Sequence, residues 1–469
     1  MNWREERDSL GVVRVPADAL WRAQTQRAVE NFPLSGERMP EPFLRALALI
    51  KQAAARVNGR RGLLDPERAE AIARAAEAVA AGHHLDQFPV DVFQTGSGTS
   101  SNMNANEVIA TLAERHLGGR LHVHPNDHVN LCQSSNDVVP TAIQLAAALE
   151  LRDRLEPARQ RLVETVAARA EALADVVKTG RTHLMDAMPL TFGQELSAWV
   201  AQLEAAGARL AEAARRLHAL PIGGTAVGTG VNSFPGFGAE VAAELASLTG
   251  LPLSAHPCPF FGIASVDAPL EFSAQLRGLA VAMLKICNDL RWMNSGPLAG
   301  LAEIELPALQ PGSSIMPGKV NPVIPEAVAM ACVQVLGFDA ALAVAGQSSN
   351  FQLNVMLPLV ARNLLQGVTL LANGARLLAN KAVSGFRVNR ERIEATLAQN
   401  PILATALNPL IGYERAAEIA RRAFAERRPV LEIALEETDL PREVLERLLD
   451  PRRLTQPNLE PGQSAGGGS

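Results

Sequence analysis

The chain contains little lysine and few aromatic residues. Aromatic side chains make up 4% of its 469 residues. Only five of its 44 basic residues are lysines, namely Lys51, Lys178, Lys285, Lys319 and Lys381. Arginine therefore supplies positive charge wherever any cation suffices. Because an ammonium group and a guanidinium group are not interchangeable, a lysine in a loop rich in Gly, Ser and Pro, such as Lys319, indicates a chemical role.

The usual signatures of metal and nucleotide sites are also missing. No CxxC pair occurs among the cysteines, which are Cys132, Cys258, Cys287 and Cys332, and this favours free thiols in a reducing compartment. His122, His124 and His128 fit neither an HExxH helix nor a closed zinc set. The run Gly223–Gly230 has neither GxGxxG spacing nor the Lys-Ser/Thr of a phosphate loop, and we interpret it as a tight connection. We therefore expect no metal and no organic cofactor.

Charge and hydropathy give no sign of a nucleic-acid or membrane partner. The net charge is −5 and the pI is about 6.1, whereas nucleic acids and acidic membranes select basic patches. The N-terminus MNWREERDSLGVVRVP has no apolar signal region. A membrane span needs about 20 consecutive apolar residues, and no charge-free stretch reaches that length. We expect a cytoplasmic protein whose polar, Gly-rich C-terminal tail is disordered.

Apolar residues recur at helical spacing through the middle of the chain. This pattern predicts long amphipathic helices at Thr141–Val177, Gln194–Leu220, Glu271–Met293, Pro325–Gly346 and Phe351–Asn380. We expect a mainly α protein with three domains: a mixed, mainly helical domain at 1–133, a long-helix bundle at 134–390 and a small helical domain at 391–469. The helices carry more apolar surface than the loops of one subunit can cover, so an oligomer is the favoured interpretation and a long monomeric bundle the alternative.

Four polar segments rich in small residues interrupt the helical pattern. They are Thr95–Asn106, His124–Asp137, Gly180–Glu195 and Gly312–Glu326. Most run into a predicted helix, and capped helix N-termini bind anions such as carboxylates. One such segment is usually only a capped helix start, but four in one chain indicate a site.

The last two of these segments hold the residues best suited to chemistry. Ser313 and Ser314 follow Gly312, so the backbone can approach a ligand closely. A nearby cation such as Lys319, together with backbone N–H groups, favours the alkoxide form of a serine. His183 is the natural acid or base near neutral pH, although a single histidine is more often structural.

The motif GSSIMPGKVNP at Gly312–Pro322 resembles the shared motif of the superfamily that includes class II fumarases and aspartases. Further resemblance to class II fumarase covers nearly the whole chain, at Asp8–Pro33, Gln94–Val108, His124–Asp137, Gly180–Glu195, Gly223–Asn232 and Phe351–Pro358. The resemblance implies a mainly helical, three-domain subunit whose long helices assemble into a tetrameric core. Three subunits would then build each active site.

Two short motifs distinguish the fumarase and aspartase branches. GSGT at Gly96–Thr99 and QSSND at Gln133–Asp137 are typical of fumarases, whereas Lys285–Arg291 and Gln352–Met356 are aspartase-like. The resemblance thus implies reversible hydration of fumarate to (S)-malate in the tricarboxylic acid cycle, by anti addition and elimination of water. Aspartate ammonia-lyase is the alternative. A non-catalytic structural homologue is a second alternative, against which the intact residues Ser313, Lys319, His183 and Asn136 argue.

The resemblance also implies roles for individual residues. Ser313 would be the base, His183 polarised by Glu326 would handle the proton that leaves with the hydroxyl, and Lys319 would stabilise the charged intermediate. The implied substrate-binding residues are Ser97, Gly98, Thr99, Ser134, Ser135, Asn136, Thr182, Ser314, Lys319 and Asn321. A secondary dicarboxylate site would comprise His124, Asn126 and Asp127; the nearest upstream arginine there is Arg120. Met185 and Met188 stand where many fumarases have Gln and Thr.

Overall fold

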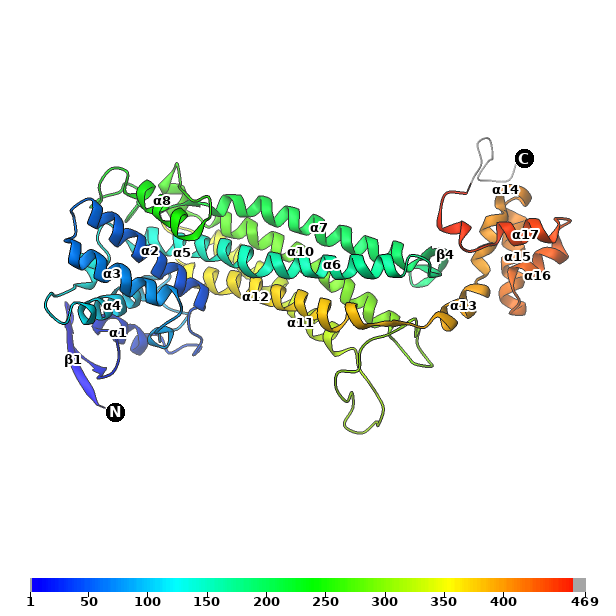
Figure 1. Ribbon diagram of the computed structural model, residues 1–469, viewed down its shortest axis with the longest axis horizontal. Helices are drawn as coiled ribbons and strands as arrows, with labels where there is room; N and C mark the ends of the chain where they lie inside the picture. Colours follow the sequence, from blue (N-terminus) through cyan, green and yellow to red (C-terminus); the bar gives the residue numbers. More distant parts are fainter. Residues whose placement is uncertain (1, 459–469) are drawn as a thin grey trace. The chain divides into compact units, whose positions relative to one another are not determined.

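The computed structural model describes residues 2–458 and is mainly helical, as the sequence predicts (Figure 1). The tail that we expect to be disordered lies outside these residues. The chain divides into two compact units. The first comprises the chain up to Ala158, Ala206–Val281 and Ala331–Asn373, and the second comprises Arg159–Ala205, Ala282–Met330 and the described chain from Gly374 onward. The expected division at residues 133 and 390 stays a prediction.

The first unit begins with a hairpin and continues as packed helices. Its elements are β1 (Trp3–Asp8), β2 (Gly11–Pro16), α1 (Ala23–Asn31), α2 (Glu41–Arg60), α3 (Pro66–Ala80), η1 (Leu85–Gln87), α4 (Thr99–His116), the π-helical turn η2 (Pro125–Val129), α5 (Ser135–Glu150), η3 (Leu151–Leu155), β5 (Ala219–Leu220), α8 (Phe237–Thr249), β6 (Ser254–Ala255) and α9 (Pro259–Ala264). Helix α2 contacts α3, α5 and α8. Its fully buried side chains include Phe43, Leu47, Ile50 and Val57; their spacing places them on one helix face.

The long helices run through both units. They are α6 (Glu156–Ala172), α7 (Phe192–Leu217), α10 (Asp267–Met293), α11 (Val323–Gln347) and α12 (Leu357–Lys381). The predicted helix Thr141–Val177 is divided into α5 and α6 by the π-helical turn η3. The prediction of helix from Phe351 was wrong by six residues. Phe351 has φ +52° and Asn350 pairs with Leu353 in an isolated bridge, so the helix starts only at Leu357.

The second unit contains two small antiparallel pairings and a C-terminal helical cluster. Its further elements are β3 (Val177–Thr182), β4 (Met185–Thr191), β7 (Ile304–Glu305), η4 (Val383–Gly385), β8 (Arg387–Val388), α13 (Arg390–Ala398), η5 (Pro401–Leu407), α14 (Asn408–Ile411), α15 (Tyr413–Glu426), α16 (Val430–Glu437), α17 (Arg442–Leu448) and η6 (Arg453–Thr455). Strand β3 pairs with β4, and β7 pairs with β8. Leu407, Ile419, Ile433 and Leu445 form the buried centre of the C-terminal cluster.

Helix α11 is long and apolar enough to cross a membrane by length and composition alone. It nevertheless carries Glu326 and Asp339, and Asp339 is buried against Ser273 Oγ and Arg277 Nη1 at 2.8 and 2.6 Å. One face is buried through Val328, Cys332, Val335 and Leu342. This is the pattern of a core helix in a folded protein. Another face leaves Met330, Val333 and Val344 exposed.

Candidate active site

The GSGT segment in the first unit is packed so closely that it requires glycine. A Cβ atom on Gly96 would lie 1.8 Å from the carbonyl oxygen of Val355, and Leu357 N donates to Gly96 O at 2.9 Å. Gly98 has φ +74° and precedes the first residue of α4, Thr99. The hydroxyls of Ser97 and Thr99 lie 2.8 Å apart. Folding of this unit therefore fixes two hydroxyls at a helix N-terminus, where anions bind favourably.

The QSSND segment forms the start of α5. Ser134 and Asp137 make a capping box, in which side chains satisfy backbone N–H groups at the helix start. The Asp137 carboxylate accepts from the backbone N–H groups of Ser134, Gly223 and Thr225 at 2.9, 2.9 and 3.0 Å. Burial raises the pKa of Asp137 to about 6, although these N–H groups oppose the shift.

The glycine-rich run Gly223–Gly230 is thus more than the connection we expected. It supplies two of the donors to Asp137, and the backbone carbonyl of Ala226 accepts from Asn136 Nδ2 at 2.8 Å. Asn136 is one of the implied substrate-binding residues, so this run helps to orient it. No motif in the sequence indicated the role, because the donors are backbone groups whose direction depends on the fold.

A buried lysine that sequence reasoning missed lies behind these two segments. Lys51 is fully buried, and its Nζ donates to Asn130 Oδ1 and Gln133 Oε1, both at 2.9 Å. Asn130 Oδ1 also accepts from Asn102 and Asn106 on α4, each at 3.2 Å. Burial lowers the pKa of Lys51 to about 7, against the attraction of Asp137. This amide cluster ties α2, α4 and the approach to α5 together.

Ser135 and the implied secondary site also lie in the first unit. Ser135 Oγ accepts from Asn102 Nδ2 at 3.2 Å. His124 caps the turn η2, with its Nδ1 accepting from Asp127 N at 3.1 Å, whereas Asn126 and Asp127 are exposed. Arg120 lies 3.5 Å from Glu67. Among residues 2–458, no group of three or more His, Cys, Asp or Glu could hold a metal ion.

The serine loop of the second unit closes on itself. Gly312 N donates to Lys319 O at 2.8 Å, and Asn321 Nδ2 donates to Gly312 O at 2.7 Å. Ser313 Oγ accepts from the N–H groups of Ile315 and Met316 at 3.2 and 2.9 Å. N–H groups aimed at an oxygen favour negative charge on it. The loop thus gives Ser313 an environment that suits a base, while Ser314 and Lys319 are exposed.

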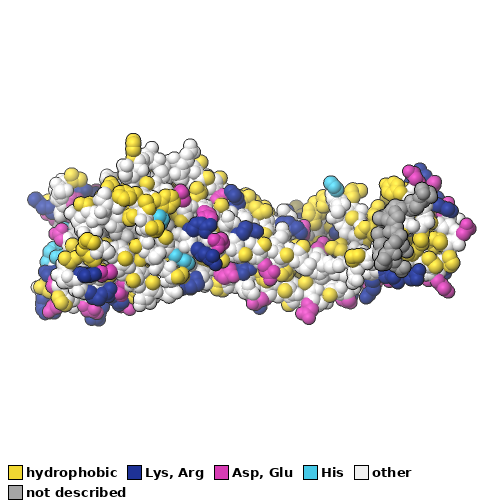
Figure 2. Space-filling model, turned by 90° about the horizontal axis from the view of Figure 1, so that it is seen from above, with side chains coloured by type: hydrophobic (Ala, Val, Ile, Leu, Met, Phe, Trp, Pro, Cys, Tyr) yellow, Lys and Arg dark blue, Asp and Glu magenta, His cyan; other side chains and the backbone are white. Residues whose placement is uncertain are grey.

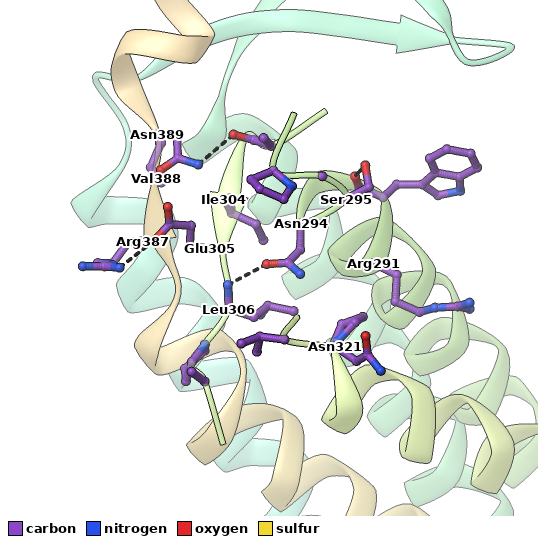
Figure 3. Close-up of a pocket in the computed structure, with 18 of the residues that line it drawn as sticks. Arg291, Asn294, Ser295, Ile304, Glu305, Leu306, Asn321, Arg387, Val388 and Asn389 are labelled. Carbon is purple, nitrogen blue, oxygen red and sulfur yellow. Dashed lines mark hydrogen bonds and ion pairs between the residues drawn. The ribbon is translucent and has the colours of Figure 1, made fainter. Parts of the chain in front are cut away.

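A cavity of about 1430 Å³ adjoins this loop within the second unit (Figure 3). Lys319, Asn321 and Glu326 line it, but Ser313 and Ser314 do not. Elsewhere in the lining, Leu306 N donates to Asn294 Oδ1 at 2.7 Å and Asn389 Nδ2 donates to Ala302 O at 2.8 Å. Four arginines are also among the residues that line the cavity: Arg291, Arg387, Arg390 and Arg392.

His183 lies at the exposed tip of the β3–β4 hairpin, directly after the exposed Thr182. Within the described chain, no hydrogen bond or ion pair joins His183 to Glu326 or to the serine loop. The implied pairing of His183 with Glu326 therefore stays a prediction. The site residues that the resemblance implies fall into two sets, one in each unit. Each set by itself is incomplete as an active site.

Comparison with known proteins places the chain in a family. The Lyase family matches residues 11–337, more than half the chain, and the domain described as Fumarase C C-terminus matches residues 403–456. The chain therefore belongs to the lyase family. A class II fumarate hydratase from Xylella fastidiosa (strain Temecula1 / ATCC 700964) is 59% identical over 465 residues, which are 99% of this chain and 98% of the relative.

Solved structures show the same likeness. A class II fumarase from Schistosoma mansoni matches with a TM-score of 0.94 and 37% identity, covering 97% of this chain and 99% of that one. A fumarate lyase:delta crystallin from Brucella melitensis bound to cobalt matches with a TM-score of 0.93 and 44% identity, covering 97% of this chain and 100% of that one. Within the lyase family, the chain belongs to the class II fumarate hydratases.

Proposed function

We infer that the protein is a fumarate hydratase that interconverts fumarate and (S)-malate in the tricarboxylic acid cycle. The observation that carries this inference is the likeness to class II fumarate hydratases over almost the full chain. The GSGT and QSSND motifs stand intact at the starts of α4 and α5. These motifs favour fumarate hydratase over aspartate ammonia-lyase, despite the aspartase-like segments Lys285–Arg291 and Gln352–Met356.

In the proposed mechanism Ser313 Oγ removes a proton from C3 of malate. The electron pair of that C–H bond is delocalised into the adjacent carboxylate, which becomes an aci-carboxylate with two negative charges. Lys319 and Asn321, both in the wall of the cavity, stabilise this charge, since preorganised donors aimed at developing charge give the largest rate gains. His183, polarised by Glu326, supplies a proton to the C2 hydroxyl, which leaves as water while the electron pair of the aci-carboxylate forms the C2=C3 double bond of fumarate. The reverse sequence hydrates fumarate.

The substrate carboxylates would bind to hydroxyls and amides. Ser97, Thr99, Ser134 and Asn136 lie where α4 and α5 begin, and Thr182 and Ser314 are exposed in the second unit. Gly98, Ser135 and Asn321 complete the proposed binding set. His124, Asn126 and Asp127 would form a secondary dicarboxylate site.

We propose that the active site forms in a homotetramer. Hydrophobic side chains occupy parts of the exposed surface (Figure 2), and an exposed face of α11 presents Met330, Val333 and Val344. An apolar helix face of this kind is stabilised by burial against another helix. Association would also bring the serine loop of one subunit to the polar segments of others, which explains why each set of residues is incomplete in one chain.

The reaction can be tested by following absorbance in the fumarate band. Addition of malate should produce fumarate, whereas addition of aspartate should produce neither fumarate nor ammonia. Ammonia release from aspartate would identify an aspartate ammonia-lyase instead. Inactivity with both substrates would support the non-catalytic homologue. Sedimentation of the same sample tests the tetramer.

A further inference from the structure

The turn that carries His183 has an unfavourable backbone conformation. Thr182 pairs with Met185, so His183 and Leu184 are the two central residues of a two-residue hairpin turn. Their φ angles are +55° and +62°. Asparagine and glycine adopt such angles readily, but other L-residues do so at an energetic cost. This conformation persists only where the surrounding structure holds it.

The base of the same hairpin is held by a buried ionic cluster. Lys178 on β3 is fully buried, and its Nζ donates to Glu195 Oε2 at 2.7 Å and to Glu303 Oε2 at 2.8 Å. It also lies 4.4 Å from the centre of the Phe192 ring. Arg181, two residues before His183, forms a second ion pair with Glu303. Two cations thus face two carboxylates, so the cluster is balanced in charge.

Glu303 is itself fixed to its surroundings by its backbone. Its N–H donates to Met293 O and its carbonyl accepts from Asn389 N, both at 2.9 Å. Glu303 is also buried, with 5% of the residue exposed. An anchored carboxylate that binds both Lys178 and Arg181 limits the movement of β3 relative to this segment.

The other strand of the hairpin is held by a separate contact. Asn400 Nδ2 donates to Ala187 O on β4 at 2.9 Å. The register shifts between Thr179 and Arg181, and a Cβ atom on Gly180 would lie 2.5 Å from Met188 O. This bulge bends β3, so that Arg181 and the hairpin tip point in a different direction from the residues before Gly180.

We propose that Arg181, Lys178 and Glu303 are positioning residues that hold the strained hairpin tip so that the His183 imidazole keeps its orientation for proton transfer. The proposal rests on the proposed function, and in particular on His183 as the acid or base. The cluster acts through the backbone of β3 and does not touch the substrate. Arg181 is the closest of the three to the tip and the most accessible, with 19% of its side chain exposed.

The first test is the substitution Arg181→Gln in the full-length enzyme. A misplaced catalytic group reduces rate more than binding, and a shift of about 1 Å can cost about 10²-fold. We expect kcat to fall by between about 10-fold and 10²-fold, with KM within about threefold of the wild-type value and an altered pH profile of kcat/KM. Arg421→Gln is the matched control, because it also removes an Arg–Glu ion pair, with Glu418 at 2.8 Å; it should leave kcat and the profile unchanged.

A double-mutant cycle with His183→Gln separates positioning from general stabilisation. If Arg181 acts through His183, then Arg181→Gln should cause no further loss of kcat once His183 is removed, since coupled residues are not additive. Losses that multiply in the double variant, or a wild-type kcat and pH profile for Arg181→Gln, would overturn the proposal. Wild-type turnover of His183→Gln alone would instead refute the role of His183 in the proposed function.

Two further variants keep the test decisive. If Arg181→Gln does not assemble, Arg181→Lys is used with the same cycle. Nη1 and Nη2 of Arg181 both donate to the Glu303 carboxylate, and lysine keeps the charge but loses this two-nitrogen contact. Leu184→Gly relieves the strain at the tip because glycine adopts positive φ freely. It should recover part of the kcat lost in Arg181→Gln. Failure to recover any kcat would contradict the argument that strain makes the cluster necessary.

Discussion

Two polar regions of the molecule look alike in sequence but are built differently. The starts of α4 and α5 in the first unit are joined to Gly223–Gly230 and to the buried Lys51 by hydrogen bonds from several elements. The serine loop at Gly312–Asn321 in the second unit bonds chiefly to itself, and most of its residues are exposed. One chain therefore completes the hydrogen bonds of the first region on folding, whereas the second stays exposed in one chain, and in the proposed tetramer other subunits would complete its surroundings.

This difference separates the consequences of substitution. A change in the first region disturbs a buried hydrogen-bond network and so affects the free energy of unfolding. A change in the exposed serine loop removes few contacts from the folded chain and so affects turnover with little loss of stability. Substitutions in the two regions test whether the comparison holds.

The largest effect is expected from Ser313→Ala. Loss of a general base typically costs about 10²-fold to 10⁴-fold in rate. The rate of malate dehydration should therefore fall by at least about 10²-fold. The melting temperature and the sedimentation coefficient should match the wild type, because within residues 2–458 the hydrogen-bond partners of Ser313 Oγ are N–H groups of its own loop. Turnover close to wild type would exclude Ser313 as the base.

Lys319→Arg should produce the next largest loss of turnover. A guanidinium is planar and larger than an ammonium, so it cannot place its charge where Lys319 does. Loss of one stabilising group for a developing anion costs about 10²-fold to 10³-fold, and we expect the lower end because the charge is kept. Lys285→Arg is the matched control, since Lys285 pairs with Asp289 on the exposed surface; it should be neutral. Normal kinetics for Lys319→Arg would contradict the argument that a lysine in this arginine-rich chain indicates a chemical role.

Sequence reasoning predicted the helical part of the molecule well and the buried polar part poorly. Apolar periodicity located α7, α10 and α11 because each helix buries one apolar face along its length. It failed at Phe351–Met356, where apolar residues continue but the backbone leaves helical angles to pack beside Gly96.

Lys51 shows the physical reason for the other failures. In the run LALIKQAAARV a lysine is indistinguishable from a cation on the solvent face of an amphipathic helix. Its burial depends on Asn130 and Gln133, about 80 residues away along the chain. The pairing of His183 with Glu326 is a further case, since the described part of a single chain contains no hydrogen bond or ion pair between the two residues.

Gly96→Ala should reduce stability in the first region. Because the new Cβ atom would lie 1.8 Å from the Val355 carbonyl oxygen, the backbone must move, and overpacking of this kind costs about 1–3 kcal/mol. Gly278→Ala is a control of opposite sign: it lies in α10 with nothing within 4 Å of a Cβ atom, so alanine should stabilise the helix by about 0.5–1 kcal/mol. Chemical denaturation measures both. An unchanged midpoint for Gly96→Ala would contradict the close packing of this region.

The smallest effect is a pH dependence of stability that originates from Lys51. Burial lowers its pKa from 10.5 to about 7 in the folded protein. Between those values the unfolded chain binds the extra proton, so the free energy of unfolding rises with pH across this window and the destabilisation is complete below about pH 7. The rise between pH 7 and pH 8 should be about 1 kcal/mol.

Lys51→Met should flatten this rise, whatever its effect on absolute stability, whereas the exposed control Lys285→Met should retain the wild-type slope. If the free energy of unfolding changes equally with pH in wild type and Lys51→Met, then Lys51 is charged in the folded protein. The first region would then be better hydrated than the burial of Lys51 indicates.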